Sequence, residues 1–339
     1  MNEAKRFNWA EWFLNYSLYI ILGLLIVSVV VWDRTFLSWG NFANIMAQAS
    51  TRGILALGVA GMIVYTGTDL SAGRILGCSA AISASLLQST TYGARMYPGI
   101  TAPLPLILPL VLSIIAAMLF TALNAFGFAI LNMHPFIISL GTQLIAYGAL
   151  CLYIDSQAGG AQPLANLDFR YIEFVNGSFD LGFTRLPYLV IYLAVCSVAM
   201  WVVWNKTVLG KNMFAIGGNP EAAAVSGVNV ARNIFGVYLI AGVLYGIAAF
   251  LEAGRVQSVT TSTGLNYDLD AISGCVIGGV SFTGGVGTIP GVILGVVILQ
   301  TINYSLYYLG INAYLQYIIK GVIIILAVAI DMRKYIKKK

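Results

Sequence analysis

Long stretches of this chain carry no charged side chain, and that feature constrains its fold more than any other. The charge-free segments are residues 12–32, 75–94, 96–154, 186–205, 233–251 and 271–319. Soluble domains carry about 25% charged residues, whereas this chain of 339 residues carries 9%. A segment of about 18 or more residues with little charge predicts a transmembrane helix. We therefore expect an all-α, polytopic transmembrane helix bundle.

Glycine, proline and polar residues interrupt the longer segments and divide the chain into about ten predicted spans. The predicted spans are residues 17–32, 45–66, 74–91, 104–131, 136–154, 186–204, 234–251, 270–287, 289–308 and 312–330. The first span is too long for a signal peptide and lacks a small-residue cleavage site, so we expect it to be retained. The whole chain, residues 1–339, is then a single transmembrane domain.

The positions of lysine and arginine predict how the bundle is oriented. Basic residues lie before the first span, in the loop 205–233 and after the last span, and they are Lys5, Arg6, Lys206, Lys211, Arg232, Arg333, Lys334, Lys337, Lys338 and Lys339. With ten spans, all three segments fall on the cytoplasmic side, together with both termini. The loop 155–185 carries four acids, Asp155, Asp168, Glu173 and Asp180, and falls on the other side. No basic cluster beyond the tail next to the membrane supports nucleic-acid binding.

The chain resembles itself at an offset of about 180 residues, a period that suggests an internal repeat. Arg52 matches Arg232, and the tripeptide AGR occurs at 72–74 and at 253–255. Thr121, Asn132 and Gly141 match Thr301, Asn312 and Gly321. Two halves of five spans, residues 17–154 and 186–330, would cross the membrane in opposite senses, as in many transporters. The alternative is a ten-helix membrane protein with no transport role.

Few charged residues lie near or inside the predicted spans, and such residues are functional candidates. They are Asp69, Arg74, Glu252, Arg255, Asp268, Asp270 and Lys320. An acid and a base recur at corresponding junctions, because Asp69 and Arg74 flank LSAG and Glu252 and Arg255 flank AG. Each pair either closes a turn as an ion pair or contacts a substrate. Arg74, Glu252, Arg255 and Asp270 are therefore candidates for structural or gating charges.

Motifs for catalysis and for nucleotide binding are missing. The sequence holds no phosphate-binding loop of the G-x-x-x-x-G-K-[ST] type, so we expect no ATP hydrolysis by this chain itself. It offers no nucleophile with a base, no paired carboxylates and no metal-ligand cluster, which leaves no case for an enzyme or for a metal. His134, the only histidine, precedes Pro135 at a predicted helix start, and the four cysteines are isolated.

The stretch MFAIGGNPEAAAVSGVNV at 213–230 is unusually poor in large side chains for so apolar a chain. Asn219 is a good N-cap, Pro220 fits the first helical position, and Glu221 complements the helix dipole. We expect Gly217 and Gly218 to form a turn and Gly227 to end a helix of about two turns. Its surface, with Ala222 and Ala223, lacks the anchors of a membrane-surface helix, which favours a knob that enters a groove of another protein.

These residues carry a family resemblance. AIGGNPEAAAVSGV resembles the coupling loop of ATP-binding-cassette sugar import permeases of the ribose and galactose class, and TGTDLSAGR, LEAGRVQS and DAISGCVIGGVSFTGGVGT are similar to further signatures of that family. The resemblance covers essentially the whole chain. It implies a homodimer in the bacterial inner membrane, a cytoplasmic ATPase that holds Mg-ATP and engages residues 217–227, and an extracytoplasmic sugar-binding protein. Ala125 and Ser139 depart from the family pattern, which bears on substrate more than on class.

Four residues are candidates for the lining of the translocation path, namely Asp69, Asn124, Asn132 and Phe136. Asn side chains can hydrogen-bond sugar hydroxyls, and an aromatic face can stack on a sugar ring. Interhelical hydrogen bonds and core packing are the alternative roles. The sugar could be galactose, methyl galactoside, glucose or ribose. Two other functions stay open, an ion-coupled secondary sugar transporter and a membrane scaffold that only docks a partner.

Overall fold

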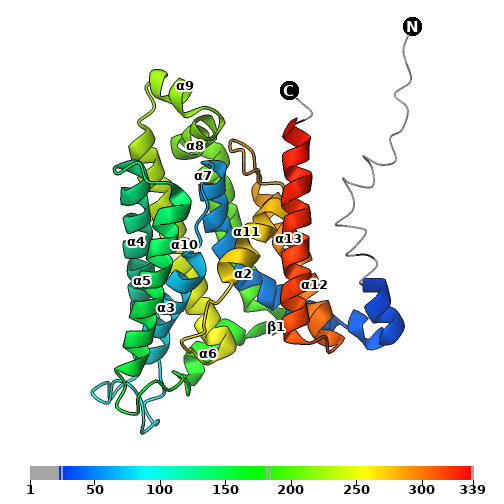
Figure 1. The fold of residues 1–339 in the computed structure, drawn as a ribbon. Helices are drawn as coiled ribbons and strands as arrows, with labels where there is room; N and C mark the ends of the chain where they lie inside the picture. The colour runs from blue at the N-terminus through cyan, green and yellow to red at the C-terminus, as the bar shows by residue number, and fades with distance from the viewer. Residues whose placement is uncertain (1–22, 24–25, 181, 183–184, 337–339) are drawn as a thin grey trace.

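The structure is a computed structural model and describes residues 23, 26–180, 182 and 185–336 (Figure 1). Within the last helix, the side chains at 324, 326–328 and 330–336 are outside this description. Lys5, Arg6, Lys337, Lys338 and Lys339 also fall outside it, as do residues 17–22, 24 and 25 of the predicted span 17–32.

Helices account for almost all regular structure in the described part of the chain. Its elements are η1 (Arg34–Leu37), α2 (Trp39–Val64), α3 (Ala72–Leu86), α4 (Ile107–Ala129), α5 (Pro135–Asp155), α6 (Phe169–Asn176), β1 (Ser178–Asp180), β2 (Arg185–Pro187), α7 (Tyr188–Lys206), α8 (Val208–Gly218), α9 (Pro220–Val225), α10 (Val230–Val256), α11 (Tyr267–Ile277), α12 (Ile289–Tyr308) and α13 (Ala313–Ile336). Six of them, α2, α4, α5, α7, α10 and α12, are long and apolar enough to cross a membrane. The prediction of a polytopic helical membrane protein is confirmed.

One predicted span is wrong in its extent. Residues 270–287 do not form a single helix, because α11 ends at Ile277 and a loop follows to Thr288. Gly279 has a φ of +84°, and its neighbour Val280 donates a backbone hydrogen bond to the Cys275 carbonyl, which closes the helix end. The glycine at this position therefore terminates a helix.

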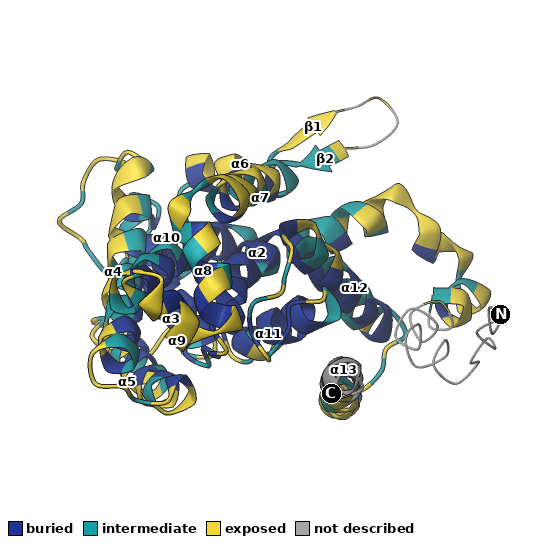
Figure 2. Ribbon diagram, turned by 90° about the horizontal axis from the view of Figure 1, so that it is seen from above, coloured by how far each residue is buried: buried dark blue, intermediate teal, exposed yellow. Residues whose placement is uncertain are grey.

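Two long helices form the centre of the bundle. In the most apolar window of each helix, 83% of residues are buried in α2 and 67% in α10, against 28% in α4, α5 and α7 (Figure 2). The packing is intertwined, since α10 lies against α3 and α4 while α2 lies against α11 and α12. Gly246 allows α10 to lie very close to α4, because a Cβ at this position would come within 3.0 Å of the Ile114 backbone. Small residues at such crossings are the usual means of packing helices in lipid.

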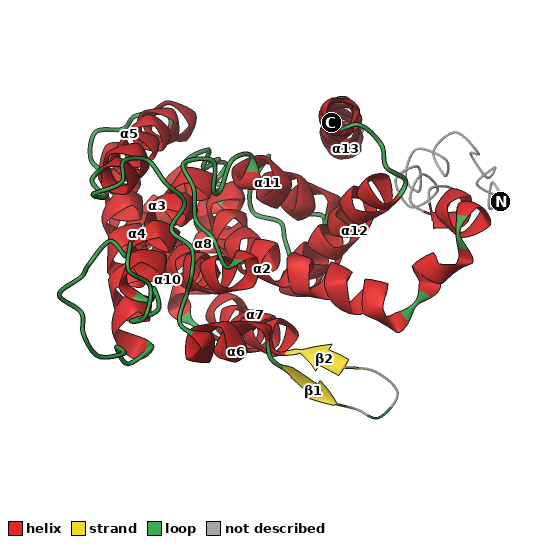
Figure 3. Cartoon of the chain, turned by 90° about the horizontal axis from the view of Figure 1, so that it is seen from below, coloured by secondary structure: helices red, strands yellow, loops and turns green. Residues whose placement is uncertain are grey.

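The two ends of the bundle differ in character. α8 and α9 lie at one end, together with the C-terminal end of α13 (Figure 1). α6 and the hairpin β1–β2 lie at the opposite end, with Ser178 paired to Pro187 in antiparallel register (Figure 3). The side chain of Asn176 fastens this end to α10 by donating to the Gly254 carbonyl at 2.9 Å. Lys206 and Lys211 thus lie at the α8–α9 end, away from the acidic loop 155–185.

The internal sequence matches fall at equivalent places in only part of the structure. Thr121 and Thr301 lie in the second half of α4 and of α12, and Asn132 and Asn312 lie just before α5 and α13. The AGR tripeptides do not correspond, because residues 72–74 begin α3 whereas residues 253–255 end α10. A constant offset therefore describes the pairs α4–α5 and α12–α13 and not the helices that precede them.

Candidate functional site

The α8–α9 segment presents a short helix that its own chain covers little. Asn219 caps α9 as predicted, with its side-chain oxygen accepting from the Ala222 amide at 2.9 Å, and Pro220 takes the first turn. Gly227 lies in the left-handed region with a φ of +85°, and Val228 donates to the Ala223 carbonyl, so the helix ends in a glycine cap.

The exposed face of α9 is small and nearly uncharged. Glu221, Ala222, Ala224 and Val225 are exposed, and Val225 is 92% exposed. Ala223 is the exception, since it is buried against the chain itself. A helix of six residues is not stable alone in water, so α9 depends on its caps and on α8 and α10, against which it lies.

The expected turn at Gly217 and Gly218 is wrong. Both residues belong to the last turn of α8, and the chain reverses at Asn219 instead. Gly217 is buried while Gly218 is exposed. Neither glycine has a positive φ, so no turn requires them. Gly217 instead permits close packing of the helix end, whereas Gly218 has open space around it.

Two of the candidate path residues meet in the interior. Asp69 and Asn124 are both completely buried, and the Asn124 amide nitrogen lies 3.4 Å from the Asp69 carboxylate. Ser71 donates to Asp69 from both its backbone amide and its hydroxyl, and Tyr245 donates its hydroxyl at 3.0 Å. We call Asp69, Ser71, Asn124 and Tyr245 the Asp69 hub. It joins the α2–α3 turn to α4 and to α10.

The other two path candidates lie together at the α4–α5 connection. Asn132 is exposed, with a left-handed φ of +51°, and Phe136 is 45% exposed on the first turn of α5. His134 caps α5, with its ring nitrogen accepting from the Phe136 amide at 3.3 Å. Ser139 reaches from α5 toward the Asp69 hub, because its hydroxyl lies 3.4 Å from the Thr68 carbonyl.

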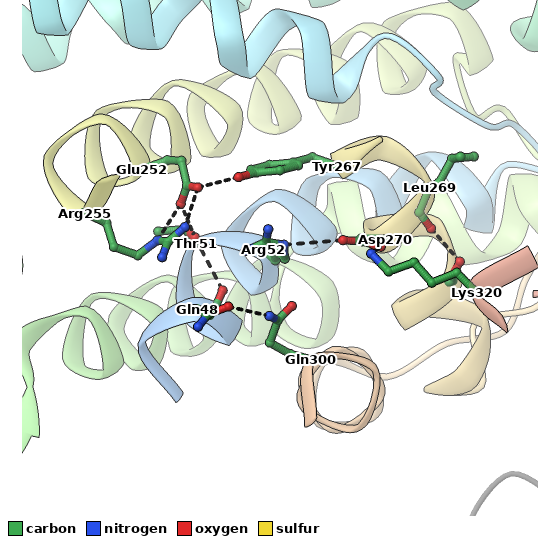
Figure 4. Close-up of polar contacts among 11 residues, drawn as sticks. Gln48, Thr51, Arg52, Glu252, Arg255, Tyr267, Leu269, Asp270, Gln300 and Lys320 are labelled. Carbon is green, nitrogen blue, oxygen red and sulfur yellow. Dashed lines mark hydrogen bonds and ion pairs between the residues drawn. The ribbon is translucent and has the colours of Figure 1, made fainter. Parts of the chain in front are cut away.

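The charged candidates form a buried network with partners that the sequence did not suggest (Figure 4). Glu252 is 1% exposed and binds Arg255, with an N–O distance of 2.6 Å. Its carboxylate also accepts from Thr51 at 2.7 Å and from Tyr267 at 2.6 Å. Of the two roles expected for Glu252 and Arg255, the structure shows the ion pair, and Thr51 extends it to α2.

Asp270 forms ion pairs with two basic side chains from different helices. Arg52 of α2 lies 3.4 Å from one carboxylate oxygen, and Lys320 of α13 lies 3.2 Å from the other. The Arg52 guanidinium also stacks 4.3 Å over the ring of Tyr267, which links Asp270 to the Glu252 pair. We call these residues, together with Glu252, Arg255 and Thr51, the charge network. It ties α2 to α10, α11 and α13.

The second predicted ion pair, Asp69 with Arg74, is wrong. The ion pairs made by the described residues do not include it. Arg74 donates instead to the Thr261 carbonyl at 3.1 Å and stacks 4.3 Å over Tyr147. Asp69 points into its own hub because the turn residue Ser71 supplies nearer donors than the arginine does.

An apolar groove lies apart from these polar groups. It lies between α2, α7 and α12, has a volume of about 780 Å³, and offers only the Ser197 hydroxyl and the Trp201 indole as hydrogen-bonding side chains. A sugar needs many hydrogen-bond partners, so this groove is unsuited to one. Within the described residues, no three His, Cys, Asp or Glu side chains are grouped so that they could hold a metal ion.

Comparison with known proteins matches the chain to transport permeases. Residues 41–328 match the family model described as "Branched-chain amino acid transport system / permease component". The chain is 50% identical over 324 residues to the galactose/methyl galactoside import permease protein MglC of Haemophilus influenzae, and the match covers 95% of each chain. It is 49% identical over 324 residues to the Escherichia coli protein of the same name, again over 95% of each chain. The ribose import permease protein RbsC of Bacillus subtilis is 31% identical over 333 residues, which cover 98% of this chain and 97% of that protein. No solved structure matches the chain.

Proposed function

This chain belongs to the transport-system permease family whose model covers residues 41–328, and from that membership we propose that it is the transmembrane subunit of an importer for galactose and methyl galactoside. A separate ATP-binding-cassette ATPase binds and hydrolyses Mg-ATP, and an extracytoplasmic sugar-binding protein delivers the sugar. The alternative substrate class is ribose or a related pentose or hexose, because the ribose permease is a more distant relative.

The exposed helix α9 is the observation that carries the coupling role. It is capped at both ends, held at one end of the bundle, and presents alanines and Val225 rather than membrane anchors. Lys206 and Lys211 lie at the same end, while the acidic loop 155–185 lies at the other. This distribution of charge supports a cytoplasmic position for α9 and both termini. We assign the ATPase contact to residues 217–227 and the binding-protein side to the α6 end.

The intertwined packing supports an inverted repeat and alternating access. A long helix, a short helix and two long helices occur in the order α2 to α5 and again in the order α10 to α13. Each central helix packs on the short and long helices of the other set. The Asp69 hub is closed in this arrangement, so sugar passes it only when α2, α4 and α10 move apart. Two copies of the chain form the complete permease in the inner membrane.

Co-purification with the ATPase subunit tests the coupling role. Glu221→Arg and Val225→Arg change exposed side chains of α9 and leave its caps intact, so both should release the ATPase and abolish ATP-driven galactose uptake in proteoliposomes. Val208→Arg makes the same change on an exposed valine of α8 and should retain both. Ala223 is less suitable, because a larger side chain there would disturb the packing of α9 on its own chain.

The alternatives predict different results in the same vesicles. A secondary transporter would take up galactose with an ion gradient and without ATP. A scaffold would bind the ATPase and transport nothing. If ATPase binding is equal in the wild type, Glu221→Arg and Val225→Arg, α9 is only a surface helix and the coupling assignment is refuted. Competition of labelled galactose with ribose and methyl galactoside then distinguishes the substrate classes.

A further inference from the structure

Three chain segments meet backbone to backbone at the C-terminal end of α8, just before α9. They are the C-terminal end of α2 at Val64, the last turn of α8 at Gly217, and the loop between α11 and α12 at Gly284 and Gly285. The Gly285 amide donates a hydrogen bond to the Val64 carbonyl at 3.0 Å. We call this contact the glycine junction.

Gly217 has no room for any side chain. A Cβ built on it would come within 3.0 Å of both the Val64 carbonyl oxygen and the Gly285 amide nitrogen. Both are backbone atoms, so no rotamer change can relieve the clash. The neighbouring Gly218 differs completely, since a Cβ there would meet nothing within 4 Å.

The loop side of the junction is equally tight. Gly284 is buried with a φ of +83°, and a Cβ on it would come within 3.0 Å of the Gly217 carbonyl oxygen. Gly279 in the same loop has a φ of +84° but open space around it. Comparing substitutions at Gly279 and at Gly284 therefore separates the effect of a left-handed backbone from the effect of the close contact.

Gly217, Gly284 and Gly285 place backbone directly against backbone, so the junction has little freedom to absorb displacement. Side chains between packed helices can change rotamer, whereas touching backbones must shift together. α9 begins three residues after Gly217, so a force on α9 reaches the junction through the last turn of α8. We propose that the glycine junction transmits the motion of α9 into the bundle and that Gly217 and Gly284 are its positioning residues. This inference rests on the proposed function.

The chain segments that form the junction continue into both halves of the bundle. Val64 is five residues from Asp69, and the connecting turn bears the left-handed Thr66, with a φ of +64°. Gly284 and Gly285 connect instead to α11 and α12. A displacement at the junction therefore acts on the Asp69 hub and on the α11–α12 pair together.

Alanine substitutions with matched controls test the junction. We expect Gly217→Ala and Gly284→Ala to assemble with the ATPase and hydrolyse ATP, yet to move at least about fivefold less sugar per ATP. Gly148→Ala, at a helical glycine of α5 with open space around it, and Gly279→Ala, at a left-handed glycine with open space around it, should keep the wild-type ratio. The ratio separates loss of coupling from loss of folded protein, which would lower both activities in proportion.

Distance measurements on chains with native glycines decide the question if the alanine variants fail to assemble. Spin labels on Ala215, an exposed residue of α8 outside the ATPase contact, and on Val286, in a chain without native cysteines, should keep their separation when the complex binds ATP, because the junction moves as a unit. An Ala215–Glu173 pair, which spans the two ends, should change its separation.

The possible outcomes distinguish failure of the proposed function from failure of the glycine junction alone. If wild-type complex shows no ATP-dependent uptake, the proposed function itself is refuted. If the wild type transports but Gly217→Ala keeps the same sugar-to-ATP ratio as Gly148→Ala, only the junction is refuted. An ATP-dependent change between Ala215 and Val286 as large as that between Ala215 and Glu173 would also overturn it.

Discussion

Removing the charge of Glu252 should destabilise the bundle far more than the same change in an exposed ion pair. The Glu252 carboxylate accepts four hydrogen bonds, two from Arg255 at 2.8 and 2.6 Å, one from Thr51 at 2.7 Å and one from Tyr267 at 2.6 Å. Glu252→Gln keeps the shape but replaces one accepting oxygen with an amino group. Arg255, whose side chain is 19% exposed, then lacks a counter-charge.

The size of the effect follows from burial. Breaking a buried ion pair by removing one partner costs roughly 3–5 kcal/mol, mainly because the other charge is left uncompensated. Glutamine retains one acceptor, so we expect a loss near the lower end, about 3 kcal/mol. The control is Asp168→Asn, since Asp168 pairs with Arg170, whose side chain is 53% exposed. Asn caps a helix as well as Asp does, and an exposed pair contributes about 0–1 kcal/mol.

Reversible unfolding in mixed micelles of mild and denaturing detergent measures both losses. The double variant Glu252→Gln with Arg255→Met removes the stranded cation, so its loss should fall short of the sum of the single losses by more than about 1 kcal/mol. Equal losses for Glu252→Gln and Asp168→Asn, or additive single and double losses, would refute the argument that an uncompensated buried charge dominates.

Two further predictions concern packing and acid stability. Gly246→Ala should cost roughly 1–3 kcal/mol in the same unfolding assay, because its Cβ would clash with the backbone of α4, whereas Gly148→Ala, with open space in α5, should stabilise by about 0.5–1 kcal/mol. Hydrogen bonding by the Arg170 side chain lowers the pKa of Asp168, so this carboxyl stabilises the fold above its unfolded pKa of about 3.9 and the gain is lost as the pH falls through the folded pKa. Asp168→Asn should therefore flatten the acid side of the profile of unfolding midpoint against pH, and an unchanged slope would contradict this.

The sequence predicted what depends on local chemistry and hydrophobicity. Long charge-free runs predicted the helices, because the bilayer core demands continuous apolar segments of sufficient length. Asn219, Pro220 and Gly227 predicted the limits of α9, because capping needs only neighbouring residues. The Glu252–Arg255 pair could also be predicted from the sequence, since residues three apart share a helix face.

Contacts between distant segments could not be predicted in this way. Arg52 lies in α2 and was used only as a repeat marker, yet it binds Asp270 across the bundle. Tyr245 donates to Asp69 from another helix, at a position that no spacing rule connects to it. The prediction of a single span over residues 270–287 was wrong for a different reason. Glycine-rich sequence fits both a close helix crossing and a helix end, and only the φ at Gly279 separates the two.

α2 connects the features argued above. Its end at Val64 forms the glycine junction, and its middle carries Thr51 and Arg52 of the charge network. Twelve residues separate Arg52 from Val64, which is about 18 Å along a helix. Gly58 lies between them and fits so closely against Tyr245 of the Asp69 hub that a Cβ would approach its ring to 2.8 Å. If α2 moves as a rigid rod, a displacement at the junction must shift Tyr245 and strain the ion pair of Arg52 with Asp270. The buried charges of this network then resist the motion, so weakening the Arg52–Asp270 pair should make the bundle easier to open as well as less stable.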